Sequence, residues 1–232
     1  MTEHAPAIRR LDHVAIRVAD RAQVTAELVE HFDVEVIDST DVFTLIGPSF
    51  TSGKITLLDA DPAKQKSAPG WFLGAVLHEP ELEQGTQVVT LPSGLVVHLV
   101  PSSLLGVSTD EVLRHALVGV VLHTDDDADD VATRLADLVG TGPATSEVAV
   151  VTTGAERSDG WVHVTSAGAV GAIELDHVGV LVDRAGAWRD FAAAAGRSVV
   201  DWVEASHSKA LFVKSDDGVV IEFIEHVDAG PA

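Results

Sequence analysis

The sequence predicts an α+β fold built from four units of about 50 residues each, and two observations support this prediction. First, one stretch occurs nearly twice: residues 10–20 and 173–183 each carry Leu-Asp-His, then apolar residues, then an aspartate. Second, each copy is followed by a helical pattern and by short strand patterns. The closing aspartates, Asp20 and Asp183, stand where they could cap those helices. Two copies of one supersecondary unit are therefore expected.

Units one and four carry the complete pattern of a strand, a helix and three strands, or βαβββ. Unit one spans residues 11–60, with a strand at 11–18, a helix at 21–32 and strands at 34–37, 42–46 and 54–58. Unit four spans residues 173–226, with a strand at 174–182, a helix at 185–195 and strands near 198–204, 209–214 and 219–225. Residues 1–10 are expected to be an N-terminal tail, and 59–70 a linker.

Units two and three are less complete copies. Unit two, residues 71–102, has a strand at 72–77, a hairpin of strands at 88–91 and 95–100, and no helix because Pro80 breaks the short segment between them. Unit three, residues 116–167, has a strand at 117–123, a helix at 128–139 behind the acidic run at 125–127, and strands at 148–152 and 161–165.

Composition narrows the classes of function. The 232 residues carry a formal charge of −21, which disfavours nucleic acid and anionic membrane surfaces as partners. Cysteine is absent, so any metal must be bound by histidine and carboxylate. The N-terminus has no leader pattern, and no apolar run approaches the roughly 18 residues of a membrane span. A cytoplasmic protein with a small-molecule substrate is expected, either as a monomer or as a homodimer.

The strand opening Leu-Asp-His-Val, the helix after it, and the final strand Val219-Val220-Ile221-Glu222-Phe223 after Asp-Asp-Gly resemble the vicinal oxygen chelate superfamily. That superfamily includes glyoxalase I, methylmalonyl-CoA epimerase, extradiol dioxygenases and antibiotic-resistance proteins. The resemblance covers about residues 10–226 and is specific in units one and four. It implies paired βαβββ modules whose curled mixed sheets surround a cleft and enclose a metal. Ligands in such families come from the first and last strands of each module.

Carried over to this sequence, the resemblance implies His177 and Glu222 as ligands from unit four and His13 from unit one. Counting 44 residues on from His13 reaches Leu57, which cannot bind a metal. Unit two offers His98 on its last strand. Unit three offers Val164 at the matching position or, one residue earlier, His163. Pairing of neighbouring units would give one site with His13 and His98 and another with His177 and Glu222. Pairing of units one and four would gather His13, His177 and Glu222, and we favour it.

Two histidines and one carboxylate form the facial triad typical of Fe(II) oxygenases. Fe(II) is therefore the expected divalent metal, with Mn, Ni, Zn and Co as alternatives. A further histidine lies about thirty residues after the fourth-module ligand in catechol-cleaving relatives, which makes His207 the candidate acid/base.

The expected function is that of a dioxygenase-like enzyme acting on a small chelating substrate, either a catechol or a 2-oxo acid. A metal-dependent glyoxalase, epimerase or isomerase is the first alternative. A non-catalytic protein that binds a small molecule, such as an antibiotic, is the second.

Overall fold

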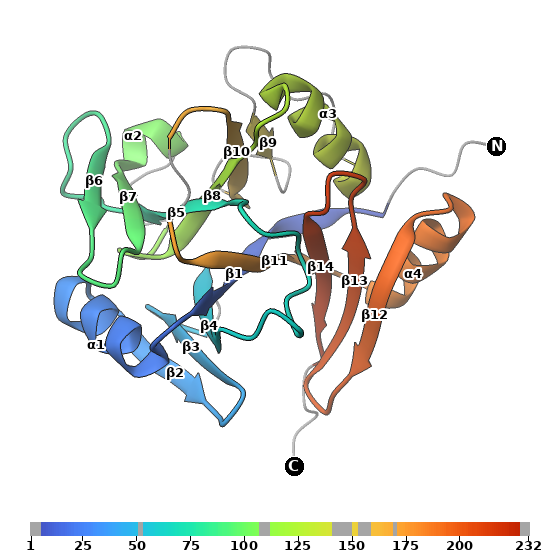
Figure 1. Ribbon diagram of the computed structural model, residues 1–232, viewed down its shortest axis with the longest axis horizontal. Coiled ribbons are helices and arrows are strands. Elements are labelled where there is room, and N and C mark those ends of the chain that lie inside the picture. Colours follow the sequence, from blue (N-terminus) through green and yellow to red (C-terminus); the bar gives the residue numbers. More distant parts are fainter. Residues whose placement is uncertain are drawn as a thin grey trace.

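The structure is a computed structural model that describes residues 6–50, 53–106, 112–140, 150–152, 159–168 and 171–227. Within this part of the chain, strands form two mixed sheets, one of eight strands and one of six, and the helices lie at the periphery (Figure 1). The predicted α+β class with mixed sheets is confirmed. None of the described helices has the length and apolar character needed to cross a membrane.

The two ends of the chain follow the same order of elements. The first consists of β1 (Ile8–Val18), α1 (Arg21–His31), β2 (Glu35–Ser39), β3 (Phe43–Gly47) and β4 (Lys54–Asp59). The last consists of β11 (Glu174–Val182), α4 (Ala185–Ala194), β12 (Ser198–Glu204), β13 (Ser208–Lys214) and β14 (Val220–His226). Every strand and helix predicted for units one and four is present. β1 starts at Ile8, inside the predicted tail, because pairing with β11 extends it past the polar Arg9 and Arg10.

The middle of the chain contains shorter sets of elements. The first set is β5 (Phe72–His78), β6 (Gln87–Thr90), β7 (Val96–Val100) and the helix α2 (Ser102–Leu105), and the second is β8 (Leu117–His123), α3 (Ala128–Val139), β9 (Val150–Thr152) and β10 (Trp161–Thr165). No helix forms between β5 and β6, as Pro80 predicted. The four-residue α2 was not predicted, since it is too short to show a helical period. Residues 148–149 of the predicted strand 148–152 lie outside the described residues.

The larger sheet joins the two ends of the chain, in blue and in orange to red in Figure 1, with the strand order β12-β13-β14-β11-β1-β4-β3-β2. The smaller sheet joins the two middle sets in the order β6-β7-β5-β8-β10-β9. Strands from units one and four therefore share one sheet, and strands from units two and three share the other. Each sheet has an antiparallel pair at its centre, β1 with β11 and β5 with β8, flanked on both sides by parallel neighbours.

The central pair of the larger sheet, β1 and β11, is deeply buried. From residue 11 onward every residue of β1 is buried, which explains why this strand reads as an apolar run interrupted by only a few polar residues. Helix α4 packs on this sheet through Trp188, whose ring stacks on Phe223 at 4.1 Å between centroids. Burying one such aromatic side chain stabilises the fold by about 2–3 kcal/mol.

Helix starts differ in how their first backbone amides are satisfied. Asp20 caps α1 by accepting a hydrogen bond from the backbone N–H of Gln23 at 2.9 Å, as predicted. Asp183 does not cap α4, so that prediction is wrong. Asp183 pairs with Arg9 instead, and the backbone N–H of Ala185 donates to Glu225 from β14. The carboxylate needed at this helix start thus comes from a neighbouring strand rather than from the preceding residue.

The segment between β4 and β5, predicted as a linker, lies against the central strands of the larger sheet. Its Ser67 donates through both N–H and Oγ to the carbonyl oxygen of Asp176, and accepts from the N–H of Val220 at Oγ. The side chain of Ser67 therefore ties β11 to β14 at the point where these strands begin to pair. This contact links two of the three strands that carry the candidate site.

Candidate metal centre

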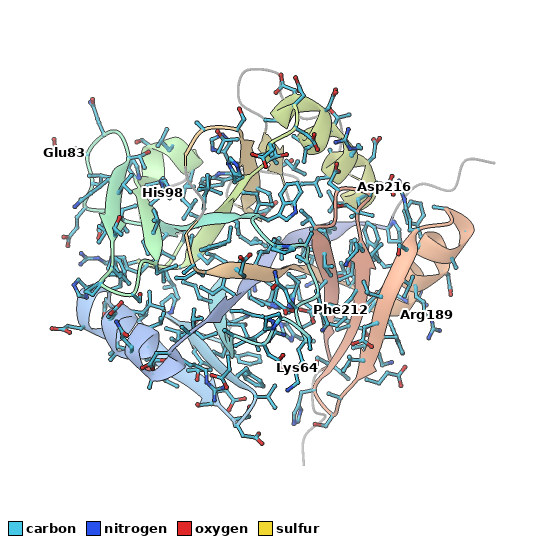
Figure 2. All side chains as sticks on the ribbon, viewed as in Figure 1. Lys64, Glu83, His98, Arg189, Phe212 and Asp216 are labelled. Carbon is cyan, nitrogen blue, oxygen red and sulfur yellow. The ribbon has the colours of Figure 1, made fainter. Side chains whose placement is uncertain are left out.

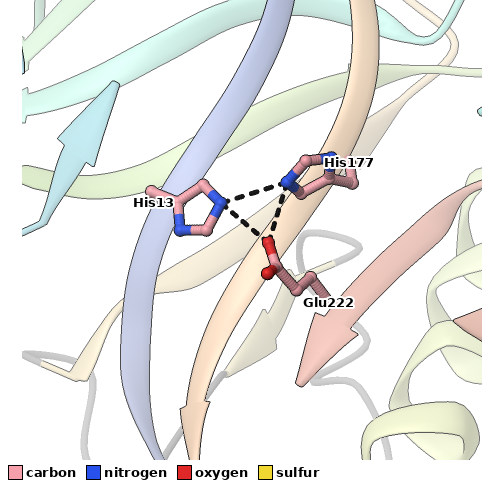
Figure 3. Close-up of side chains that lie close together, drawn as sticks. All are labelled: His13, His177 and Glu222. Atoms are coloured by element: carbon pink, nitrogen blue, oxygen red, sulfur yellow. Dashed lines mark hydrogen bonds and ion pairs between the residues drawn. The ribbon is translucent and has the colours of Figure 1, made fainter. Parts of the chain in front are cut away.

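Three polar side chains meet in the larger sheet, from β1, β11 and β14 (Figure 3). Nε2 of His13 lies 3.1 Å from Nε2 of His177 and 3.0 Å from Oε2 of Glu222, and the His177 nitrogen lies 2.8 Å from the same oxygen. The side chains are buried, with relative exposures of 7%, 7% and 5%. Among the described residues this is the only group of three or more potential ligands that converges in this way. The structure thus brings together the three residues predicted as metal ligands.

The triangle formed by these three atoms fits one face of an octahedron. Metal bonds to histidine nitrogen and carboxylate oxygen are about 2.1 Å long, so two ligands at a right angle lie about 3.0 Å apart. Two ligands at a tetrahedral angle would lie about 3.4 Å apart. The observed edges of 2.8, 3.0 and 3.1 Å are closer to the right-angle separation than to the tetrahedral one, and they also lie within the range of hydrogen bonds between such atoms. A divalent ion held here would keep three positions for other ligands.

Each imidazole is oriented by the aspartate that precedes it. Nδ1–H of His13 donates to Asp12 at 2.9 Å, and Nδ1–H of His177 donates to Asp176 at 2.7 Å. A carboxylate can only accept these bonds, so each Nε2 faces the other two atoms of the triangle and presents a lone pair there when the imidazole is neutral. Carboxylate–histidine pairs of this kind fix the tautomer and the ring orientation of metal-binding histidines.

The two aspartates face the site because of β-bulges. In a regular strand, neighbours point to opposite faces, so Asp12 and His13 could not meet. The ladder between β1 and β11 shifts register between Leu11 and His13, which leaves Asp12 as the extra residue, and a second shift leaves Asp176 as the extra residue on β11. A bulge turns the side chain of its extra residue toward the other face. Both ligand-bearing strands thus use the same device to place a carboxylate behind a histidine.

Two buried cations neutralise these aspartates. The Lys54 ammonium lies 2.9 Å from Asp12, and both side chains are 2% exposed. The Arg17 guanidinium lies 2.6 Å from Asp176 and also donates to the carbonyl oxygens of Asp59 and Lys64. Among the described residues, no lysine or arginine pairs with the remaining carboxylate, that of Glu222, which contacts the two histidines of the triad. The charge missing from this centre is therefore positive.

The pKa values of the buried groups reflect the same lack of positive charge. Burial alone would lower the pKa of His13, but the carboxylates of Glu222 and Asp12 outweigh it and raise the pKa to about 9. Burial would raise the pKa of Glu222, but the two histidines hold it well below its usual range. Burial acts in the same way on Asp12, whose pKa is held low by hydrogen bonds from His13 and His226 and by the Lys54 charge. The centre therefore retains a proton, with which a divalent cation bound by the same three atoms would compete.

The space for the rings comes from small residues in register with them. His13 lies opposite Gly179 and His177 lies opposite Ala15 in the β1–β11 ladder. A Cβ on Gly179 would lie 2.3–2.8 Å from three atoms of the His13 ring, so no larger residue fits there. On the other side of the site, the Phe212 ring packs edge-on against the His177 ring, with 5.1 Å between the ring centroids. The triad is thus enclosed by close packing on both sides.

Solved structures with a similar fold cover almost the whole chain, whereas no protein-family model and no curated protein sequence matches it. A "putative dioxygenase" from Bacillus subtilis has a TM-score of 0.66 at 14% identity, covering 98% of this chain and 87% of that chain. Glyoxalase I from Zea mays has a TM-score of 0.63 at 13% identity, covering 93% and 92%. The cppA protein from Streptococcus pneumoniae has a TM-score of 0.55 at 12% identity, covering 94% and 99%. This chain has the vicinal oxygen chelate fold. Identities this low establish the fold alone.

The strand register corrects the position that counting along the sequence had compared with Glu222. Glu222 pairs with Gly179, two residues beyond His177, and the residue that pairs with Ala15, two residues beyond His13, is Thr56. Counting along the sequence had reached Leu57 instead, which is fully buried in the apolar core on the other face of β4. The conclusion that a second carboxylate is missing is unchanged, but the residue in its place is a threonine.

The other predicted site histidines lie away from the triad. His207 is exposed in the turn between β12 and β13, five residues before Phe212, which pairs with Glu222. Five strand residues span roughly 16 Å, so the structure does not bring His207 to this centre. His98 and His163 lie on β7 and β10 of the smaller sheet. They are not part of the candidate metal centre.

Four residues that orient the triad were missed by the sequence reasoning: Asp12, Asp176, Lys54 and Arg17. A signal for the aspartates was present, since both copies of the repeated stretch read Leu-Asp-His. For Lys54 the signal was a lysine at the start of an apolar strand, a position that reads equally well as an exposed strand end. Only the structure shows that each cation is bonded to the aspartate behind a histidine.

Proposed function

We propose that this protein is a divalent-metal-dependent enzyme in which His13, His177 and Glu222 hold the ion. The observation that carries the proposal is the buried triangle of two Nε2 atoms and one carboxylate oxygen with edges of 2.8–3.1 Å. A buried carboxylate is costly without a compensating charge, and here a proton on His13, whose pKa, despite burial, its carboxylate neighbours raise to about 9, compensates Glu222. A divalent cation at the centre of these atoms would take the place of that proton.

We further propose Fe(II) as the metal and a dioxygenase-like reaction on a small substrate with two vicinal oxygens, either a catechol or a 2-oxo acid. Three protein ligands on one octahedral face support this choice, because Fe(II) bound in this way has positions for both substrate and dioxygen. The glyoxalase and epimerase branch of the superfamily generally uses four protein ligands. Here the fourth position is Thr56, whose hydroxyl cannot replace a carboxylate.

The protein's own contribution is orientation and exclusion of water. Asp12 and Asp176 hold the imidazoles in the tautomer that presents Nε2 to the metal. Around Glu222 the walls are apolar, since Ala210, Phe212 and Val220 form a buried cluster on the strands beside it. In such surroundings, charges that develop on a chelated substrate are stabilised more strongly than in water.

The side chains around the centre support the kind of substrate proposed. The Lys66 ammonium lies 3.6 Å from the centroid of the Phe212 ring, whose edge contacts His177. His226 donates to Asp12 and packs against the exposed ring of Phe50 at 5.5 Å. One cation and two aromatic rings therefore flank the triad, which suits a planar or carboxylate-bearing oxygen chelator better than a long acyl chain.

The experiment is to purify the protein without air or chelator, measure its metal content, and follow oxygen uptake with catechols and with 2-oxo acids. We expect about one iron per chain and Fe(II)-dependent uptake with one of these classes. Glu222→Ala should abolish both. The matched control is Glu225→Gln, which changes a glutamate on the same strand that hydrogen-bonds the start of α4 instead of the triad.

Three outcomes would contradict the proposal in different ways. Oxygen uptake that survives Glu222→Ala would mean that the triad does not hold the reacting metal. Exchange of solvent deuterium into substrate without oxygen uptake would favour the isomerase or epimerase class. Ligand binding unaffected by chelator, with no metal in protein that is correctly folded, would favour a non-catalytic binding protein.

A further inference from the structure

The smaller sheet carries a cavity of about 610 Å³ on the face that bears His98 and His163. His98 is labelled on β7 in Figure 2, and His163 lies two strands beyond β5, on β10. Sites for small organic ligands typically have volumes of about 300–1,000 Å³. The cavity is therefore of a size that holds one ligand of drug-like dimensions, and it is separate from the candidate metal centre.

The register shows why a cavity exists here. The four central strands run in the same relative directions in both sheets, so the rows of residues paired across them can be compared. In the larger sheet, one row of paired residues across β14, β11, β1 and β4 is Glu222, Gly179, His13 and Lys54. The corresponding row of the smaller sheet, across β7, β5, β8 and β10, is His98, Val76, Gly119 and Trp161. In the next row, His177, Ala15 and Thr56 correspond to Gly74, Val121 and His163. Glycine thus stands at both positions where the metal centre has a histidine.

These two glycines allow large rings to lie flat on the sheet. A Cβ on Gly74 would lie 2.9 Å from the His98 ring, and a Cβ on Gly119 would lie 2.9 Å from the Trp161 ring. The indole of Trp161 is 9% exposed and packs with Val76 and Val121 in a small apolar cluster distinct from the main core. The floor of the cavity is therefore an aromatic and aliphatic surface, and the two imidazoles also line the cavity.

The polar groups in the cavity are uncharged. Among the described residues that line it, none has a carboxylate, ammonium or guanidinium group. Burial lowers the pKa of both histidines, and the proximity of His163 lowers that of His98 further. Each imidazole is half-buried and makes no hydrogen bond to another described residue. Each therefore offers one acceptor and one donor nitrogen to a ligand.

We infer that this cavity is a second binding site, for an uncharged planar aromatic compound that bears hydroxyl groups. Its ring would pack on Trp161 and the valines of the floor, and its hydroxyls would hydrogen-bond to His98 and His163. The chain's net charge of −21 disfavours an anionic ligand in a cavity that lacks a cation. The inference does not depend on the metal centre or on the reaction proposed for it.

The test uses 2-naphthol as the probe, with the metal-free protein kept in chelator and binding followed by calorimetry and by tryptophan fluorescence. We expect saturable binding of one 2-naphthol per chain, at least tenfold tighter than binding of 2-methylnaphthalene or of 2-naphthoate. His98→Leu and His163→Leu should each weaken 2-naphthol about tenfold, the usual effect of removing one hydrogen bond, and should leave 2-methylnaphthalene unchanged. Val96→Phe, which fills the cavity from β7, should remove binding of both.

The matched control is His31→Leu, the same substitution on α1 outside the cavity, which should leave 2-naphthol binding within twofold of wild type. Circular dichroism of each variant verifies the fold. The inference would be overturned by 2-naphthol binding that is indifferent to His98→Leu, His163→Leu and Val96→Phe. Absence of saturable binding, stronger binding of 2-naphthoate, or a requirement for added Zn²⁺ would each overturn it as well.

Discussion

The salt bridge behind His13 allows the stability of the fold to be separated from the affinity of the metal centre. Asp12 accepts hydrogen bonds from His13 at 2.9 Å, from Lys54 at 2.9 Å and from His226 at 3.1 Å, and it is 2% exposed. In Asp12→Asn one acceptor oxygen is lost and the Lys54 charge is left buried without a carboxylate. We predict two separate losses from this one change.

The first loss is in stability, and the second is in metal affinity. Removing one partner of a buried ion pair destabilises a protein by about 3–5 kcal/mol. Removing the carboxylate behind a metal-binding histidine lowers metal affinity about 10–100-fold, or about 1.4–2.7 kcal/mol. Denaturant unfolding of metal-free protein measures the first, and titration with Fe(II) under anaerobic conditions measures the second.

A second substitution distinguishes the two effects. In Asp12→Asn with Lys54→Met the stranded cation is replaced by an apolar side chain of similar length, so most of the lost stability should return. The metal affinity should stay 10–100-fold low, because His13 still lacks its carboxylate. If the double variant regained affinity together with stability, Asp12 would act only through folding, and the orienting role argued here would be refuted.

Three further predictions follow from the same geometry. Gly179→Ala forces a Cβ to within 2.3 Å of the His13 ring, so it should abolish metal binding and cost about 1–3 kcal/mol in thermal unfolding, whereas Gly186→Ala, in open space on α4, should not destabilise the fold. Although burial opposes it, neighbouring carboxylates raise the pKa of His13 to about 9, so a proton competes with the metal below that pH. Metal affinity should therefore rise up to about tenfold per pH unit between pH 7 and 9, and a flat profile in calorimetry would contradict this. Thr56→Glu should supply a fourth ligand, raise the affinity for the metal at least tenfold and reduce oxygen uptake. An unchanged metal affinity would mean that Thr56 does not face the site.

Most of the fold could be predicted because its elements carry strong local signals. The helix over Ala128–Val139 has the predicted bounds, since Asp127 accepts from the amides of the first turn and Gly140 ends the helix in a left-handed conformation at φ 68°. The strand over Glu174–Val182 also has the predicted bounds, because its apolar run ends at a charged residue. The helix α2 was missed for lack of length. Local chemistry thus determines where elements start and end.

The ligands of the candidate site could be predicted for a similar reason, but the residues that orient them could not. His13, His177 and Glu222 are polar residues within apolar strands, and such residues call for a partner in any buried sheet. Asp12 and Asp176 are polar too, yet strict alternation places them on the opposite face from the histidines. Only the two β-bulges turn them toward the site, and a bulge of this kind has no sequence signature in the residues that form it.

The position of Thr56, opposite Ala15, is a second feature that the sequence alone could not determine. Glu222 follows His177 by 45 residues, and Thr56 follows His13 by 43, so both intervals are odd. An interval of 44 reaches Leu57, which lies on the core face of β4 with no exposed surface. Loops between the strands can lengthen or shorten by any number of residues, so an interval counted along the sequence does not determine the face on which a side chain lies, and a one-residue slip turns that side chain to the other face of the sheet. Counting along a sequence cannot detect such a slip, whereas the register of paired strands excludes it.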